Sequence, residues 1–191
     1  MPKIGMEPKR RAALVEATIG EIGSVGSLDV TVGQIARRAG MSPALAHHYF
    51  GGKAQIFLAA MRHILSQYSA EVRSSLRDAA PEQRLRAIID ANFAQSCFEP
   101  DTISAWLNFY VLAQRDDEAA RLLRIYQRRL RSNLLHALRN HVSDPAPVAE
   151  VLGALIDGMY LRAALDGNGL SRDAGSRVWD AARAMITKGQ I

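Results

Sequence analysis

Apolar residues recur along this chain at the three- and four-residue spacing of amphipathic helices, and no segment alternates in the way that predicts a strand. Pro81, Pro100, Pro145 and Pro147 fall at expected helix starts, and Gly167-Asn168-Gly169 separates the last two helices. The pattern predicts helices at residues 8–24, 32–39, 43–50, 53–78, 82–97, 101–114, 117–142, 146–166 and 172–188. We therefore expect an all-α fold of about nine helices.

Residues 31–50 predict two short helices that meet at a sharp turn. Thr31 opens the first helix with a glutamine three residues later, which is the pattern of a capping box, and Gly40 closes it because glycine tolerates a left-handed backbone. Ser42 is the expected N-cap of the second helix, and Pro43 occupies its first position, where no N–H is needed. Two helix starts this close together are typical of a helix-turn-helix motif.

The second of these helices has the composition of a recognition helix. Small and apolar side chains at its start allow close approach to bases, and the polar side chains that follow can reach bases or phosphates. Lys53 opens the next helix, where an ammonium and free N–H groups suit a phosphate oxygen. Capped helices also occur in any helical protein, but here the caps, the proline, the glycines and the basic residues all agree. The predicted DNA-binding residues are Arg10, Arg11, Thr31, Ser42, Pro43, Ala44, Leu45, His47, His48, Tyr49 and Lys53.

Several short runs resemble a known family. Thr31, Ile35-Ala36, Gly40-Met41-Ser42, His48-Tyr49-Phe50 and Lys53 resemble the DNA-binding domain of TetR-type repressors, although His47 stands where many of these proteins have a tyrosine. The resemblance narrows, at residues 1–6, 34–40 and 154–165, to the choline-responsive Bet repressors of glycine-betaine synthesis genes.

This resemblance implies a homodimeric transcriptional repressor that binds double-stranded operator DNA and controls genes for osmotic protection. It implies relief of repression by choline or a related quaternary ammonium. We expect a helix-turn-helix DNA-binding domain at residues 1–53 and a ligand-binding and dimerisation domain at residues 54–191. Because no flexible linker separates them, the boundary is expected within the helix that begins at Lys53.

An aromatic stripe and a lone carboxylate are the candidate effector site. The stripe has i, i+3, i+4 spacing, and aromatic faces attract quaternary ammonium ions. Spacing alone favours core packing, whereas the resemblance favours a ligand cage. Asp157 lies within an apolar pattern, where a carboxylate needs a partner such as a cationic ligand or an arginine of another helix. The predicted ligand-binding residues are Phe93, Trp106, Phe109, Tyr110, Asp157 and Tyr160.

Two apolar faces near the carboxyl end predict a dimer interface formed as a four-helix bundle. Packing within one chain is the alternative. A dimer is favoured because two heads about 34–36 Å apart read a palindromic site on successive turns of DNA. The predicted interface residues are Val148, Val151, Leu152, Leu155, Met159, Val178, Ala182 and Met185.

Composition and charge agree with a cytoplasmic DNA-binding protein. The chain of 191 residues has a net charge of +5, and residues 1–53 hold seven Lys or Arg against four Asp or Glu. The single Cys97 is interpreted as a small buried apolar residue. No signal peptide or membrane-spanning run is evident. The arginine-rich segment at residues 117–142 is interpreted as a solvated amphipathic helix, with a second nucleic-acid surface as the alternative.

Three rival functions remain open from the residues alone. One is a TetR-type repressor of a multidrug efflux gene that responds to larger cations, and another is an architectural DNA protein without a ligand. The third is a small helical enzyme, but the sequence has no phosphate loop, paired nucleophile and base, or metal-ligand spacing. Adjacent His47 and His48 point about 100° apart on a helix and do not chelate one ion readily. We therefore expect no enzymatic activity, cofactor or metal.

Overall fold

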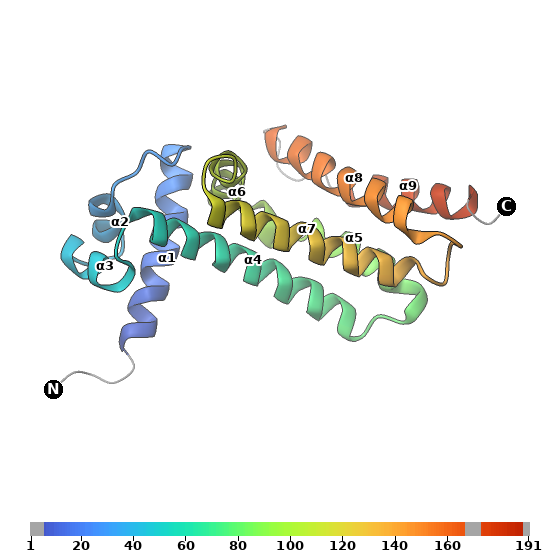
Figure 1. Ribbon diagram of the computed structural model, residues 1–191, viewed down its shortest axis with the longest axis horizontal. Helices are drawn as coiled ribbons and strands as arrows, with labels where there is room; N and C mark the ends of the chain where they lie inside the picture. Colours follow the sequence, from blue (N-terminus) through green and yellow to red (C-terminus); the bar gives the residue numbers. More distant parts are fainter. Residues whose placement is uncertain (1–5, 167–172, 189–191) are drawn as a thin grey trace. The chain divides into compact units, whose positions relative to one another are not determined.

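The computed structural model describes residues 6–166 and 173–188, and within these ranges it is entirely helical (Figure 1). Nine α-helices and two short 3₁₀ helices are present in the described residues, with no strand. They are α1 (Met6–Val25), α2 (Val32–Arg38), α3 (Pro43–Phe50), α4 (Lys53–Arg77), η1 (Pro81–Gln83), α5 (Arg84–Asn92), η2 (Gln95–Phe98), α6 (Pro100–Leu112), α7 (Asp117–Leu138), α8 (Pro145–Leu165) and α9 (Ala174–Lys188). The predicted all-α fold is confirmed, whereas the predicted Gly167-Asn168-Gly169 break lies outside the described residues.

The chain folds into two compact units. The first unit contains the described residues up to Ser66 together with Glu99–Leu123, and the second contains Gln67–Phe98 and the described residues from Arg124 onward. Helices α4 and α7 each contribute to both units. The predicted boundary at residue 53 separates a DNA-binding part from a ligand-binding part, whereas the two units are defined by their internal contacts. The functional boundary therefore stays a prediction.

Each unit has its own apolar core. The largest fully buried side chains of the first unit are Leu14, Ile22, Ile35, Ile56, Met61 and Phe109. Those of the second unit are Leu85, Ile88, Ile89, Leu134, Leu138 and Leu152. In the first unit α1 packs against α2 and α6, and in the second α9 packs against α5 and α8. None of the described helices is long and apolar enough to cross a membrane.

Two helices are shorter than the sequence predicts. The helix expected at 82–97 ends at Asn92, because Phe93 leaves the helical region with φ −113° and ψ 19°, and a separate 3₁₀ turn follows at Gln95–Phe98. The helix expected at 117–142 ends at Leu138, and the N–H of Val142 bonds back to the Leu138 carbonyl in a turn. In both places apolar residues continue past the helix end, so the hydrophobic pattern does not mark it.

Candidate DNA-binding and effector sites

Helix α2 begins and ends on its predicted caps. The Thr31 hydroxyl accepts a hydrogen bond from the Gln34 N–H at 3.2 Å, and the Gln34 side-chain oxygen accepts one from the Thr31 N–H at 2.7 Å. Gly40 follows the helix at φ +66°, and the N–H of Met41 reaches back to the Ala36 carbonyl at 2.8 Å. The predicted helix end at Gly40 is confirmed, because glycine adopts this φ without a Cβ clash.

Helix α3 also begins as predicted. Ser42 Oγ accepts a hydrogen bond from the Leu45 N–H at 3.2 Å, and Pro43 occupies the first turn. Gly51 closes the helix at φ +79°, and α4 begins two residues later at Lys53. Helix α3 packs against α2, which in turn packs against α1 (Figure 1). These three helices form the helix-turn-helix head.

The outer side of α3 is an open surface that can meet a DNA groove. Leu45 is half-buried, and His47 Nδ1 lies 3.3 Å from the Gly51 carbonyl oxygen, a contact that ties this ring to the end of its own helix. A helix with small exposed residues at its start and polar ones a turn later fits the shape of a major groove. The exposed residues of this surface are Ser42, Pro43, Ala44, His47 and His48.

Tyr49 faces the interior of the head. Its side chain is 9% exposed, and its hydroxyl accepts a hydrogen bond from Arg10 Nη1 at 3.3 Å. The Arg11 guanidinium lies 5.6 Å from the centroid of the Tyr49 ring and 5.2 Å from that of Phe50, and its Nε donates to Glu7 Oε1 at 2.9 Å. Tyr49 is therefore buried against the arginines of α1, and its predicted contact with DNA stays a prediction.

Lys53 is exposed at the first position of α4, as predicted. Its ammonium lies 5.4 Å from the centroid of the buried Phe57 ring. This cation–π contact orients the charge without neutralising it. Thr31, at the start of α2, is exposed as well.

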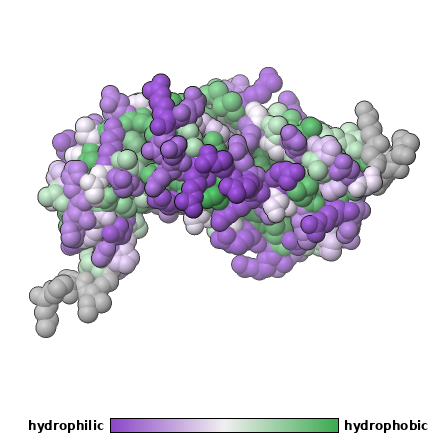
Figure 2. Space-filling view, in the orientation of Figure 1, coloured by the Kyte–Doolittle hydropathy of each residue, from purple (hydrophilic) through white to green (hydrophobic). Residues whose placement is uncertain are grey.

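The arginine-rich helix α7 carries a solvated basic side. Arg121, Arg124 and Arg128 are exposed, while Leu130 and Leu134 are buried. In Figure 2 the side of the molecule that carries α4 and α7 is covered mainly by hydrophilic residues. This distribution agrees with the predicted amphipathic helix.

Asp157 in the second unit is paired with a tyrosine. Tyr126 donates its hydroxyl hydrogen to Asp157 Oδ1 at 2.8 Å. Burial raises the pKa of the Asp157 carboxyl above its usual value, and the Tyr126 hydrogen bond partly offsets that rise. Arg162, at i+5, is exposed on the same helix. Among the described residues, no cationic side chain forms an ion pair with Asp157.

One aromatic pair in the second unit meets this carboxylate through Tyr126, and another includes Tyr160, which lies three residues further along α8. The Tyr68 ring meets that of Tyr126 edge-on, with centroids 5.4 Å apart, and the Phe98 and Tyr160 rings lie 5.0 Å apart. The Tyr160 hydroxyl donates to the Cys97 carbonyl at 2.9 Å. Burial raises the pKa of Tyr68, with the charge of Asp157 adding to that rise. The Tyr68 hydroxyl is buried near the Asn92 side chain without a well-formed hydrogen bond to it.

The predicted ligand-binding residues divide between the two units. Phe93 packs on Phe98 in the second unit, with centroids 6.4 Å apart, near Tyr160. Trp106, Phe109 and Tyr110 lie on α6 in the first unit, where the Trp106 ring contacts both others at 5.4 Å. Phe109 has no exposed surface, so it belongs to the core of its unit, and Trp106 is 7% exposed.

Sequence reasoning missed three aromatic members of this cluster. Tyr68, Phe98 and Tyr126 are not among the predicted ligand-binding residues. The one available signal was Asp157 itself, because a carboxylate in an apolar pattern requires a partner. The partner is a tyrosine 31 residues away rather than an arginine.

Some predicted dimer-interface residues are buried inside one chain. Leu152, Val178 and Ala182 have no exposed surface because α8 packs on α9, so they add nothing to a surface that a second copy could cover. Val151 is 52% exposed, and Val148, Leu155, Met159 and Met185 are half-buried.

The outward side of α8 presents a different apolar stripe. Val151, Leu161 and Leu165 are 52%, 43% and 66% exposed, and Ala154 and Gly158 lie between them. The successive spacings of three and four residues place all five on one helical face.

No cluster of three or more His, Cys, Asp or Glu residues that could hold a metal ion occurs in the part of the chain that the structure describes. Cys97 is half-buried, and burial raises the pKa of its thiol. A raised pKa keeps a thiol in its less reactive form.

Comparison with known proteins identifies the family. Residues 14–60 match the family of bacterial regulatory proteins of the tetR type, and residues 81–187 match the C-terminal domain of BetI-type transcriptional repressors. The regulator BetI of Brucella suis is 52% identical over 181 residues, which are 93% of this chain and 90% of the relative. BetI of Rhizobium meliloti is 48% identical over 177 residues, covering 91% of this chain and 87% of the relative.

Solved structures confirm the fold. A transcriptional regulator from Pseudomonas aeruginosa superposes with a TM-score of 0.83 at 22% identity, covering 94% of this chain and 91% of that one. A regulator from Saccharomonospora viridis, solved in complex with choline, superposes with a TM-score of 0.77 at 21% identity, covering 91% of this chain and 95% of that one. The helix-turn-helix head, the two family matches and the near-complete coverage by these relatives lead to one conclusion. The chain belongs to the BetI-type transcriptional repressors of the TetR family, which are DNA-binding regulators rather than enzymes.

Proposed function

We propose that this repressor acts in the cytoplasm on a palindromic operator of genes that convert choline to glycine betaine, and that choline weakens its hold on DNA. The observation that carries the effector assignment is Asp157, a half-buried carboxylate with aromatic neighbours and no cationic partner among the described residues. The choline complex of the fold relative from Saccharomonospora viridis supports this choice.

A quaternary ammonium ion suits this cluster because it cannot donate hydrogen bonds. It is held instead by a carboxylate and by aromatic faces, each of which contributes about 0.5–2 kcal/mol. Asp157, Tyr68 and Tyr160 are half-buried and so keep surface for a ligand. Burial raises the pKa of the Asp157 carboxyl, and a cation bound beside the ionised carboxylate would offset that cost of burial. We place choline against Asp157, with Tyr126, Tyr68 and Tyr160 as aromatic contacts.

The predicted ligand-binding residues Trp106, Phe109 and Tyr110 lie on α6, and this helix is hydrogen-bonded to α1. Ser104 Oγ donates to the Ile22 carbonyl at 3.2 Å, and Asn108 Nδ2 donates to the Gly26 carbonyl at 3.2 Å. Gly23 allows close approach, because a Cβ there would overlap Asp101. Helix α6 is thus fastened to the helix that carries Arg10 and Arg11. A displacement of α6 would therefore be passed to α1 and to the DNA-binding head within the first unit.

Such a shift requires different affinities for two states of the dimer. Choline must bind more tightly to the state whose heads are out of register with successive major grooves. An effector that bound both states equally would leave repression unchanged.

We assign dimerisation to the outward side of α8. Its stripe consists of apolar side chains, with Ala154 and Gly158 at the centre, and no atom lies within 4 Å of the position of a Gly158 Cβ. Small residues at the centre of a stripe let two helices approach closely. Two copies of α8 and α9 packed in this way would form a four-helix bundle.

Calorimetric titration tests the effector. We expect saturable heat with choline and much weaker binding of tetraphenylphosphonium, a bulky lipophilic cation. Tighter binding of tetraphenylphosphonium would instead support a repressor of an efflux gene. Absence of binding by both cations would contradict the effector proposal and leave the DNA-binding assignment intact.

A further inference from the structure

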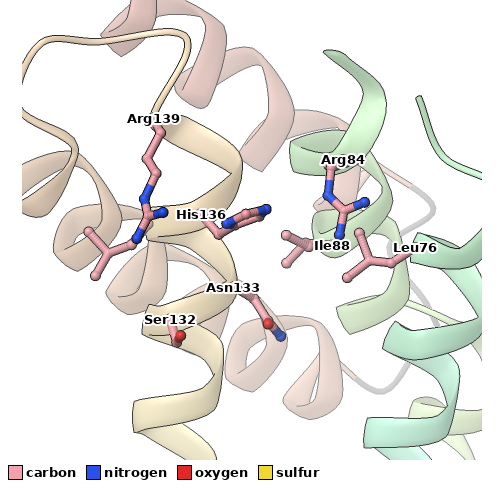
Figure 3. Close-up of a pocket in the computed structure, with 8 residues that line it drawn as sticks. Leu76, Arg84, Ile88, Ser132, Asn133, His136 and Arg139 are labelled. Carbon is pink, nitrogen blue, oxygen red and sulfur yellow. The ribbon is translucent and has the colours of Figure 1, made fainter. Parts of the chain in front are cut away.

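A pocket lies in the second unit, lined by other residues than those assigned to choline. It has a volume of about 260 Å³ and lies between the end of α4, helix α5 and the last turns of α7. Figure 3 shows His136 extending from α7 towards the side where Arg84, Ile88 and Leu76 lie. This volume is near the lower end of small-molecule sites, so it suits a ligand of few heavy atoms.

The polar lining of this pocket consists of cations and hydrogen-bond donors. Arg84 comes from α5, and Ser132, Asn133, His136 and Arg139 come from α7. None of the residues that line it is acidic. Two guanidinium groups beside an imidazole, an amide and a hydroxyl form a lining that repels a cation and attracts an anion.

The Arg84 side chain has a hydrogen-bond donor, Nε, without an acceptor in the described part of the chain. This nitrogen is buried as well. A buried donor without an acceptor is costly, so an oxygen at this position would be favourable. A guanidinium presents its donors in a planar fork that matches a carboxylate or a phosphate.

The apolar side of the pocket restricts the ligand further. Leu76 and Ile88 form it, and Ile88 has almost no exposed surface. An oxyanion with a short hydrocarbon part would place its charge against Arg84 and its carbon atoms against these side chains. The concave shape favours such a small molecule over the backbone of a nucleic acid.

We propose that this pocket binds a small oxyanion, either a carboxylate or a phosphate, through Arg84, His136 and Arg139. Asn92 connects this pocket with the choline cluster. Its side chain donates a hydrogen bond to the carbonyl of the pocket residue Ile88 at 2.8 Å, and it also lies beside Tyr68 of the cluster. A second metabolite would thus bind beside the effector site, independently of which cation that site takes.

Titration of the full-length protein tests the proposal. Inorganic phosphate and succinate are added separately by calorimetry at constant ionic strength, so that the two arms distinguish a phosphate from a dicarboxylate. We expect saturable binding of at least one of them and a loss of about tenfold or more in affinity in Arg84→Gln. Arg131→Gln removes the same charge from an exposed position of α7 and should leave the affinity unchanged.

A second variant protects the test from a folding defect. Arg139→Gln changes an exposed lining residue and should weaken the same ligand while the helical circular dichroism stays intact. Absence of saturable binding of both anions, or equal weakening by Arg131→Gln, would overturn the proposal. So would an Arg139→Gln variant that loses affinity for duplex DNA but keeps its affinity for the anion, since this surface would then serve nucleic acid.

Discussion

At the scale of single residues, Asp157 is the proposed charge partner of the effector. Its carboxylate accepts a hydrogen bond from Tyr126, and burial raises its pKa. Between the ordinary pKa of about 3.9 and the raised value, the folded protein holds a proton that the unfolded chain releases. In the ligand-free protein the ionised form that attracts a cation therefore predominates above that raised pKa.

Asp157→Asn should lower choline affinity by about tenfold or more, because one attractive charge near the ligand is worth more than about 1.4 kcal/mol at low dielectric. Asparagine keeps an acceptor for Tyr126, so the fold is preserved. Calorimetry measures the affinity, and Asp180→Asn, at an exposed position of α9, is the matched control. Unchanged affinity in Asp157→Asn would remove this residue from the effector site.

The same carboxyl predicts a pH dependence of stability in the absence of ligand. Because the pKa is raised on folding, its contribution to the free energy of unfolding falls as the pH rises through the raised value. Urea unfolding at a series of pH values measures the free energy of unfolding of Asp157→Asn and of the native protein. Relative to the native protein, the variant should become more stable toward about pH 7 and should lose this advantage toward about pH 4. A gain that is the same at every pH would contradict the raised pKa.

At the scale of elements, the helix-turn-helix head contains two glycines, of which only Gly40 has a backbone conformation that favours glycine. Gly40 closes α2 at φ +66°, where no neighbouring atom lies within 4 Å of an added Cβ. Gly33 lies inside α2, where an added Cβ has open space beyond the Thr31 hydroxyl at 3.7 Å. An added Cβ meets no clash at either position, so alanine substitutions at the two glycines differ in backbone strain alone.

Gly40→Ala should destabilise the protein by about 1–2 kcal/mol, since an L side chain is strained in the left-handed region. Gly33→Ala should be neutral or stabilising by about 0.5–1 kcal/mol, because alanine has the higher helix propensity. Denaturant unfolding of both variants measures the difference. Equal effects of the two substitutions would mean that the Gly40 backbone does not control the turn.

The same elements show what could be predicted from the sequence. The caps at Thr31, Ser42 and Gly40 use side chains and backbone within four residues, so local pattern was enough to find them. The end of α5 at Phe93 and the pairing of Asp157 with Tyr126 depend on distant packing. Tyr49 was expected at the DNA surface because its polar tip was visible in the sequence, whereas its burial against α1 was not.

At the scale of the whole molecule, the proposed reading of a palindromic operator requires two copies of the chain. Fully buried Leu152, Val178 and Ala182 fasten α8 to α9 within one chain, so the proposed interface is the outward stripe of α8. A single short recognition helix contacts few base pairs, and a second head at a fixed distance multiplies the specificity.

Leu161→Asp should therefore convert the dimer to monomer, because it buries an unpaired charge in the stripe. Analytical ultracentrifugation measures the mass, and Val111→Asp, at a position of α6 that is 56% exposed, should leave it unchanged. A Leu161→Asp protein that remains dimeric would place the interface elsewhere.

We propose that two heads together read an operator and that choline loosens them from it. The most direct measurement is the affinity of the purified protein for a promoter fragment of the choline-oxidation genes against a shuffled duplex, at moderate salt, with and without choline. We expect a marked preference for the promoter fragment, and we expect this preference to fall when choline is added. Equal affinity for the promoter fragment and the shuffled duplex, or a preference that choline leaves unchanged, would contradict it.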